Sequence, residues 1–477
     1  MSDRPLVVDL DGTLILTDLL HESALKLLRE RPLCALQLPV KLTAGKAQLK
    51  HYIAERTELL AETLPYNTRL IDWLRQERGR GRQLILCTAS NGKFARQVAD
   101  YLDLFDDVMA SDDTSNLKGA HKAQQLVARF GEGNFDYAGN SRADLPIWES
   151  AAEAVVVNAD AELAAEAALR CPVAKTFAAQ EIKSLDWRQA LRIQQWLKNL
   201  LLFAPVLAAH RLMESDTLLL LALAFVSFGM VASSTYLMND LLDLEADRLH
   251  PRKRDRPLAA GIIPVPVAIA VGAGLLVTGL LLAVTINQQF LACLLCYLFI
   301  TCCYSWFLKR QILLDCITLA MLYTLRIIAG AAAIDMGLSF WLLAFSAFLF
   351  LSLAFVKRYA EIELLLLQGR DKLHGRGYYT SDAPLLQTLG ISAGYAAALV
   401  LSLYLNSDEI LLLYKTPEIV WGAVLVLLYW ISWMWMQANR GLMHDDPLVF
   451  AIKDRVSLLA GAVFLLVLSL GTVELPW

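Results

Sequence analysis

The sequence of 477 residues lacks a strong excess of either charge and lacks nucleic-acid-binding motifs. Lysine and arginine together number 43 against 47 aspartate and glutamate residues, which gives a formal net charge of -4. This balance of charges does not favour a polyanion as binding partner, and no zinc-finger or basic-arm pattern is present. We therefore expect no nucleic-acid partner.

Paired cysteines and a signal peptide are also missing. The eight cysteines are scattered, and the one CxxC, Cys293 with Cys296, has no second pair. A zinc-ribbon site needs two such pairs, so we expect these side chains to pack as small apolar groups. The first residues, MSDRPLVVDLDGTL, lack a basic region followed by a longer apolar region. We therefore expect the N-terminal part to lie in the cytoplasm.

Long uncharged runs are present, but they are confined to the second part of the chain. Hydrophobic residues make up 56% of the sequence, which is more than a soluble protein of this length carries. Charged and apolar residues alternate up to about Lys183, and uncharged runs dominate beyond about Leu200. The sequence predicts a soluble domain over 1–180, an amphipathic linker helix over 181–199 and a membrane domain over 200–477.

The soluble part alternates short apolar runs with helical patterns. PLVVDL, QLILCTAS and NFDYAGNS each read as a buried strand that ends in small or polar residues. Strands that alternate with helices indicate an α/β fold with a Rossmann-like parallel sheet, whose ligands lie at the carboxyl ends of the strands. The stretch from Leu16 to Gly81 is mostly helical in pattern and interrupts the alternation, as an inserted cap would.

The membrane part predicts an all-α transmembrane bundle of about nine helices. The first and last candidates are short for a hydrocarbon core of about 30 Å. The candidate spans are 197–209, 217–238, 264–285, 288–307, 312–334, 338–356, 386–405, 418–437 and 457–472.

Basic residues between these spans predict the orientation of the bundle. The connections after even-numbered spans carry fifteen lysine and arginine residues, and the opposite connections carry two. Because positive loops stay inside, we expect a multi-pass protein of the cytoplasmic (inner) membrane with its C-terminus on the opposite side. The fifteen are Arg248, Arg252, Lys253, Arg254, Arg256, Lys309, Arg310, Lys357, Arg358, Arg370, Lys372, Arg376, Arg440, Lys453 and Arg455, and the two are Arg211 and Lys415.

The motif VVDLDGTL places Asp9 and Asp11 directly after a predicted strand. Two such carboxylates can hold Mg²⁺, and one can attack phosphorus while the other moves protons. The motif resembles the first motif of the haloacid dehalogenase-like phosphatases, over about residues 1–170. The resemblance implies that Asp9 is the nucleophile and Asp11 the general acid and base.

The same resemblance assigns further residues of the phosphatase site. Thr88 matches the hydroxyl that binds the phosphoryl group, and either Lys118 or Lys122 matches the lysine that balances its charge. In GNSRAD, Asp144 matches a metal-supporting acid, while Asn140 stands where the family usually has aspartate. Asp9, Asp11, Asn140 and Asp144 would form the Mg²⁺ site. An amide weakens such a site, so an inactive domain kept as a scaffold remains an alternative.

The stretch NDLLDLEADRLHPRKRDRP follows a predicted span directly. On a helix, Asn239, Asp243 and Asp247 lie at i, i+4 and i+8 along one stripe, with Asp240 beside it. Mg²⁺ binds a few carboxylates together with substrate phosphate oxygens. The basic residues that follow can contact the rest of a diphosphate; we single out Lys253, Arg254 and Arg256.

This pattern resembles the first motif of the UbiA-type intramembrane prenyltransferase superfamily, over about residues 187–477. The resemblance implies a second Mg²⁺ site, with Asp243 and Asp247 as catalytic ligands. A second aspartate-rich motif, usual in aromatic prenyltransferases, is replaced here by VKRYAEIELLLLQGRDKLHGRGYY. Near the fourth connection the chain keeps Asp315 as an acid, with Tyr304, Lys309 and Arg326 around it.

Four further segments are similar to the branch that transfers phosphoribose to polyprenyl phosphate, the decaprenyl-phosphate phosphoribosyltransferase type. These segments are QWLKNLLLFAPV, YSWFLKRQILLDCITLAMLYTLRIIAG, VKRYAE and DPLVFAIKDRVSLL. The resemblance implies phosphoribosyl pyrophosphate as donor and polyprenyl phosphate as acceptor. Lys309, Arg326, Lys357 and Arg358 are candidates for binding the acceptor phosphate, or are ordinary inside-facing charges.

The pairing of the two domains favours one pathway. Phosphoribosyl transfer leaves a 5-phosphate on the lipid-linked sugar, and a phosphatase domain would remove it, in a step of the kind used in cell-envelope biosynthesis. An alternative enzyme would move a prenyl group from prenyl diphosphate to an aromatic acceptor, with a phosphatase-like regulatory head. A transporter is a further alternative, but its charges would lie at mid-membrane rather than at helix ends.

Overall fold

A computed structural model describes residues 4–113, 116–209, 214–367, 369, 371, 376–407, 414–443 and 446–473. The chain divides into two compact units, Met1–Leu191 with Tyr236–Gly272 and Arg192–Thr235 with Ala273–Trp477. Each unit is described by itself below. Three charges used to predict orientation, Arg211, Arg370 and Lys372, lie outside the described residues.

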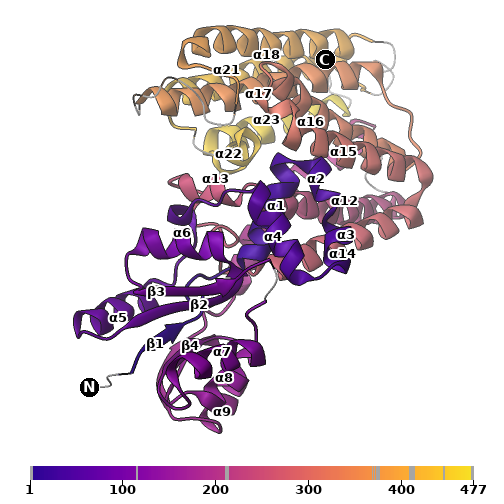
Figure 1. The fold of residues 1–477 in the computed structure, drawn as a ribbon. Helices are drawn as coiled ribbons and strands as arrows, with labels where there is room; N and C mark the ends of the chain where they lie inside the picture. The colour runs from indigo at the N-terminus through magenta and orange to yellow at the C-terminus, as the bar shows by residue number, and fades with distance from the viewer. Residues whose placement is uncertain are drawn as a thin grey trace. The chain divides into compact units, whose positions relative to one another are not determined.

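The first unit is built on a parallel sheet of six strands, which confirms the predicted α/β fold (Figure 1). The strand order is β3-β2-β1-β4-β5-β6, and every neighbouring pair is parallel. The strands are β1 (Leu6–Val8), β2 (Leu84–Asn91), β3 (Asp107–Ser111), β4 (Asp136–Gly139), β5 (Ala154–Ala159) and β6 (Val173–Ala178). β1 is central because its residues are apolar and buried on both faces.

Helices cover both faces of the sheet and form two separate cores (Figure 1). On one face, α5 (Thr68–Gly79) and α6 (Gly92–Leu102) bury leucine, valine and phenylalanine side chains. On the other face lie α7 (Ala120–Phe130), α8 (Leu145–Ser150) and α9 (Ala161–Ala168). The short elements of this unit are η1 (Ala61–Thr63), η2 (Arg142–Asp144) and α10 (Ser184–Ala190).

A helical cap follows β1, as the sequence predicts. It consists of α1 (Leu19–Glu30), α2 (Pro32–Ala35), α3 (Leu38–Thr43) and α4 (Lys46–Arg56). A small core with Leu27, Tyr52 and Ile53 holds the cap together. The predicted stretch extends to Gly81, but α5 packs on the sheet core rather than on the cap. The helical spacing of the apolar residues in α5 does not show whether they pack on the cap or on the sheet.

The segment that carries the acidic motif also belongs to the first unit. It comprises the end of α12 (Ser215–Leu242), α13 (Leu244–Leu249), a series of turns and the start of α14 (Val265–Ile286). In these turns Gly261 has a φ of +74°, and a Cβ atom there would lie 2.8 Å from the Cβ of Leu16. Only glycine therefore fits this approach to the root of the cap.

Seven helices of the described chain are long and apolar enough to span a membrane, and a bent pair makes up to eight. The bent pair is α22 (Pro447–Lys453) with α23 (Arg455–Gly471), at 84° to one another. The first predicted span is instead a 3₁₀ helix, η3 (Ile193–Phe203), followed by α11 (Ala204–Ala208). The chain is therefore a multi-pass membrane protein, and the bundle roughly matches the nine helices expected.

The second unit also contains α15 (Gln288–Trp306), η4 (Leu308–Arg310), α16 (Leu314–Ala333), α17 (Phe340–Leu367), η5 (Thr380–Asp382), α18 (Ala383–Leu405), α20 (Pro417–Val420) and α21 (Gly422–Asn439). Its core lies among α16, α17, α18 and α21. The 3₁₀ helix η3 packs against α16, where a Cβ on Gly330 would lie 2.0 Å from the carbonyl oxygen of Leu202. Any side chain at this position would force the two elements apart. Cys293 and Cys296, on α15, are free thiols.

Candidate active sites

The carboxyl end of β1 places Asp9 beside a buried lysine. Lys122, on α7, donates from Nζ to Asp9 Oδ1 at 2.7 Å, to the Cys87 carbonyl at 3.0 Å and to the Tyr137 hydroxyl at 2.9 Å. Lys118, the other candidate from the sequence, is exposed. Burial raises the pKa of Asp9 to about 6, although Lys122 opposes the shift. Lys122 thus places a positive charge directly beside the buried carboxylate of Asp9.

Asp11 lies between the start of the cap and the end of β2. Its Oδ1 accepts from the amide of Leu19 at 2.8 Å, and its Oδ2 accepts from Ser90 Oγ at 2.6 Å and Thr88 Oγ1 at 3.3 Å. Burial raises the pKa of Asp11 to about 7, which suits a general acid and base near neutral pH. Thr88 therefore lies with the two carboxylates, and Ser90, two residues further on, was missed from the sequence.

The GNSRAD turn contributes Asn140 and Asp144. Asp144 is buried, and its Oδ2 accepts from the amides of Asn140 and Ser141 at 3.1 and 3.0 Å. Its Oδ1 accepts from the Tyr137 hydroxyl at 3.0 Å, which links it to Lys122. The Asn140 amide packs so closely against Gly12 that a Cβ atom on Gly12 would lie 2.1 Å from Asn140 Nδ2. Asn140 therefore faces the loop that begins directly after Asp11.

The side-chain oxygens of Asp9, Asp11 and Asn140 are the candidate Mg²⁺ ligands of this site. Within the described ranges no group of three or more histidine, cysteine, aspartate or glutamate side chains forms a metal cluster. Mg²⁺ is bound by as few as one or two carboxylates, with waters and substrate phosphate completing its shell. Asp9, Asp11 and the amide oxygen of Asn140 offer such a set of hard oxygen donors. The residues present therefore fit Mg²⁺, with Asp144 supporting the turn that holds Asn140.

The acidic motif bends where the sequence predicts a continuous helix. α12 ends at Leu242 and α13 begins at Leu244, with Asp243 between them at φ -101°. The amides of Asp243 and Asp247 still bond to carbonyls four residues earlier, at 3.0 and 2.8 Å. The i, i+4, i+8 spacing therefore keeps its helical hydrogen bonds, while the helix itself is interrupted at the central acid.

Basic residues of the same segment neutralise this motif. Arg256 Nη1 lies 3.0 Å from Asp240 Oδ1 and 2.6 Å from Asp247 Oδ2, and both acids are buried. Lys253 Nζ lies 3.6 Å from Asp247 Oδ1. Arg254 is exposed and faces Asp255. Asn239 is half-buried, one helical turn before Asp243. The oxygen donors of this stripe fit Mg²⁺, and the bases beside it fit the phosphate oxygens of a diphosphate.

In the second unit, two lysines share one carboxylate. Lys198 and Lys357 donate to Asp446 Oδ2 at 2.8 and 3.0 Å, and the Tyr323 hydroxyl donates to Oδ1 at 3.2 Å. Burial would raise the pKa of Asp446, but Lys357 and Lys198 outweigh it and hold the pKa well below its ordinary value. Sequence reasoning missed Lys198 and Asp446, although each lies in a segment that carried the family resemblance.

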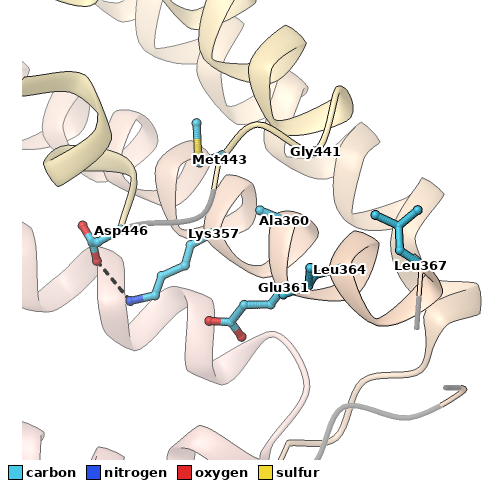
Figure 2. Close-up of a pocket in the computed structure, with 8 residues that line it drawn as sticks. All are labelled: Lys357, Ala360, Glu361, Leu364, Leu367, Gly441, Met443 and Asp446. Carbon is cyan, nitrogen blue, oxygen red and sulfur yellow. Dashed lines mark hydrogen bonds and ion pairs between the residues drawn. The ribbon is translucent and has the colours of Figure 1, made fainter. Parts of the chain in front are cut away.

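A pocket of about 170 Å³ opens beside this cluster (Figure 2). Lys357 and Glu361 line it from α17 one turn apart, and Asp446 lies across from them with Lys357 pointing to it. Apolar side chains form the rest of the wall, among them Leu364 and Met443. The pocket therefore combines a charged end with an apolar wall, as a site for an amphiphilic molecule requires.

The other candidate cations of this unit lie in buried networks. Arg358 Nη2 lies 2.7 Å from Asp315 Oδ2 with both side chains fully buried, and Arg358 also pairs with Glu361. Arg376 joins Asp315 to the Tyr304 hydroxyl at 3.3 and 3.2 Å. These contacts tie the connection after α17 to α15 and α16.

Arg326 and Lys309 are placed differently. Arg326 is buried, donates to Asn199 Oδ1 at 3.1 Å and lies over the rings of Phe228 and Tyr297 at 5.0 Å from each centroid. Lys309 is half-buried in η4. Arg326 therefore lies near Lys198, because its partner Asn199 is the next residue of η3. Asp315 lies in a separate group with Arg358 and Tyr304.

Residues 200–453, more than half of the chain, match the UbiA prenyltransferase family. The chain belongs to this family. Residues 6–149 match the haloacid dehalogenase-like hydrolases, so the chain joins a domain of that kind to a UbiA domain. The phosphatase-like constellation and the acidic motif thus lie in the parts that these two families define.

Three relatives show how far the likeness extends. An uncharacterized protein of Sinorhizobium fredii, y4nM, is 36% identical over 96% of this chain and 89% of its own length. A nodulation protein of Azorhizobium caulinodans, NoeC, is 37% identical over 63% of this chain and 96% of its own length. A decaprenyl-phosphate phosphoribosyltransferase of Mycolicibacterium smegmatis is 33% identical over 56% of this chain and 86% of its own length.

Proposed function

We propose that this protein transfers 5-phosphoribose from phosphoribosyl pyrophosphate to polyprenyl phosphate and then removes the 5-phosphate, giving polyprenyl-phosphoryl-ribose. The observation that carries the proposal is the presence, in one chain, of two groups of carboxylates and bases that suit the binding of phosphate. One is the Asp9–Lys122 constellation, and the other is the acidic motif with its bases. The mycobacterial relative supports the transfer step by its name and by its similarity over 274 residues.

In the transfer step, Asp243 and Asp247 would hold Mg²⁺, with Asn239 as a further oxygen donor. A bound Mg²⁺ would neutralise charge on the pyrophosphate leaving group. Lys253 and Arg256 bind the remaining phosphate oxygens, for which Arg256 exchanges its contacts with Asp240 and Asp247. The C1–O bond to pyrophosphate breaks as the acceptor phosphate oxygen forms its bond to C1. The negative charge that develops on the leaving pyrophosphate is stabilised by Lys253 and Arg256, which hold its oxygens before the C1–O bond breaks.

The acceptor is proposed to bind through the lysine pair of the second unit. Lys198 and Lys357 converge on one carboxylate, and a phosphate monoester can replace that carboxylate as their common acceptor of hydrogen bonds. The pocket beside them has the apolar wall that a prenyl chain requires. Fifteen basic residues on one set of connections support an inner-membrane location with these ends in the cytoplasm.

In the phosphatase step, the Asp9 carboxylate attacks phosphorus and the bond to the ribose 5-oxygen breaks. Asp11 gives its proton to that leaving oxygen and then takes a proton from the water that hydrolyses the aspartyl-phosphate. Lys122 offsets the negative charge around Asp9, and Thr88 and Ser90 offer hydroxyls to phosphate oxygens. Asp9, Asp11 and Asn140 would hold Mg²⁺ here, so each domain would carry one ion.

The transfer proposal is tested with purified protein, polyprenyl phosphate, Mg²⁺ and phosphoribosyl pyrophosphate labelled in the ribose. We expect label in the lipid fraction, loss of this label in Asp243→Asn, and its retention in Asp255→Asn. Asp255 lies in the same segment, and its side chain is 78% exposed. If the wild-type protein labels no lipid but transfers label from prenyl diphosphate to an aromatic acceptor, the proposed donor is wrong.

A further inference from the structure

The cap helix α1 carries a charged stripe that faces the acidic motif within the first unit. Glu22, Lys26 and Arg29 lie at i, i+4 and i+7, which places them on one side of the helix. Each bonds to a different residue of the motif segment, so the three contacts follow α1 along most of its length. A helix of 12 residues extends about 18 Å.

The contact nearest the start of α1 is a buried ion pair. Glu22 accepts from both terminal nitrogens of Arg248 at 2.6 and 2.7 Å, and the two side chains are 5% and 7% exposed. Arg248 also donates from Nε to the Ala259 carbonyl at 2.7 Å. Bidentate pairing of this kind fixes the guanidinium plane as well as its position. Glu22 therefore fixes both α13 and the turns that follow it.

The other two contacts, further along α1, reach Asp243 of the motif and the nearby Glu245. Arg29 Nη1 lies 2.9 Å from Asp243 Oδ1 and donates to the Leu242 carbonyl at 2.8 Å, so it bonds to the last residue of α12 and to the acid that follows. Lys26 donates to Glu245 at 2.6 Å. The cap thus bridges the interruption between α12 and α13 in addition to Arg256, which joins Asp240 to Asp247 from within the segment.

We propose that α1 of the phosphatase domain is a positioning element of the transferase, with Glu22 and Arg29 as its positioning residues. Arg29 sets the orientation of Asp243 at the helix interruption, and Glu22 sets α13, which carries Asp247. Neither residue touches substrate; each acts through a motif residue that it holds. This role of α1 adds to the proposed transfer function, and only the kinetic part of its test depends on that function.

The test uses the full chain in lipid nanodiscs with Glu22→Gln, Arg29→Gln and the control Asp72→Asn, whose side chain is 68% exposed in a surface ion pair outside the cap. Backbone hydrogen–deuterium exchange of residues 236–264 is measured first, because it requires no substrate. We expect faster exchange in α13 for Glu22→Gln and Arg29→Gln, and wild-type exchange for Asp72→Asn. Turnover of p-nitrophenyl phosphate shows that the phosphatase fold is intact.

Kinetics then separate positioning from general stability. We expect KM for phosphoribosyl pyrophosphate to rise by about tenfold or more in Glu22→Gln, a small part of the cost of breaking a buried ion pair. The swapped variant Glu22→Arg with Arg248→Glu should recover part of the loss, since it restores opposite charges. Wild-type exchange in α13 together with an unchanged KM in both single variants would overturn the proposal. If the wild-type protein does not use this donor, the exchange result alone decides on α1, so the two failures are distinguishable.

Discussion

Replacing Lys122 by methionine should disable the phosphatase site by neutralising Asp9. The Lys122 side chain is 4% exposed, and its ammonium lies 2.7 Å from Asp9 Oδ1. A carboxyl group with a pKa of about 6 is about nine-tenths ionised at pH 7, and a neighbouring positive charge lowers such a pKa by about 1 to 3 units. Without that charge, the pKa of Asp9 rises to about 7 to 9, so half or more of Asp9 is protonated at pH 7, and a protonated carboxyl group does not attack phosphorus.

The expected loss in kcat/KM at pH 7 is about 2- to 100-fold, because a rise of 1 to 3 pKa units lowers the ionised fraction of Asp9 from about nine-tenths to between about one half and one hundredth. The assay is hydrolysis of p-nitrophenyl phosphate by the full chain between pH 5.5 and 9. The activity of Lys122→Met relative to wild type should rise with pH, because alkaline solution ionises Asp9 in the variant. Lipid labelling by the transferase should be unaffected.

Lys118→Met is the matched control, since Lys118 is exposed on the segment that precedes α7. It should retain wild-type activity at every pH. A relative activity of Lys122→Met that does not change with pH would refute the reasoning, because Lys122 would then not act through the ionisation of Asp9. Equal losses in both lysine variants would refute it as well.

Three further predictions follow from the sites and the packing. Asp9 and Asp11 have pKa values raised from 3.8 to about 6 and about 7, so the stability of the metal-free protein falls progressively as pH rises from about 4 to about 7. Mg²⁺ binding, which requires ionised carboxylates, should therefore release protons at pH 6 and almost none at pH 8.5 in calorimetry with different buffers, and equal release at both would contradict this assignment. Gly330→Val should lower the thermal unfolding temperature strongly, whereas Gly274→Val, with nothing within 4 Å of its Cβ, should not. Asp446→Asn leaves two cations without their carboxylate and should destabilise the bundle by about 3 kcal/mol or more, with added polyprenyl phosphate restoring part of the loss; no effect of the lipid would contradict the acceptor site.

The sequence predicted the elements whose signal is local. Strand-like runs that end in polar residues located β1, β2 and β4, and therefore brought Asp9, Asp11 and Thr88 to one edge of the sheet. The uncharged runs predicted the long membrane helices for the same reason. Each of these signals depends on residues that are neighbours in the chain.

Features that depend on tertiary contacts could not be predicted in the same way. The choice between Lys118 and Lys122 depends on the rotation of α7 above β1, which sequence spacing leaves open. The interruption at Asp243 is bridged by Arg29, more than 200 residues earlier in the chain. The grouping of Lys198 with Asp446 joins two segments 248 residues apart, and each reads as an ordinary charge at a helix end.

The central claim is that one chain first transfers phosphoribose to lipid and then removes its 5-phosphate. The most direct measurement is the mass of the lipid product formed by wild-type protein and by Asp9→Asn from polyprenyl phosphate, phosphoribosyl pyrophosphate and Mg²⁺. The account predicts polyprenyl-phosphoryl-ribose from the wild type and a product heavier by one phosphate group from Asp9→Asn. The same dephosphorylated lipid from both proteins, or a product without ribose, would contradict it.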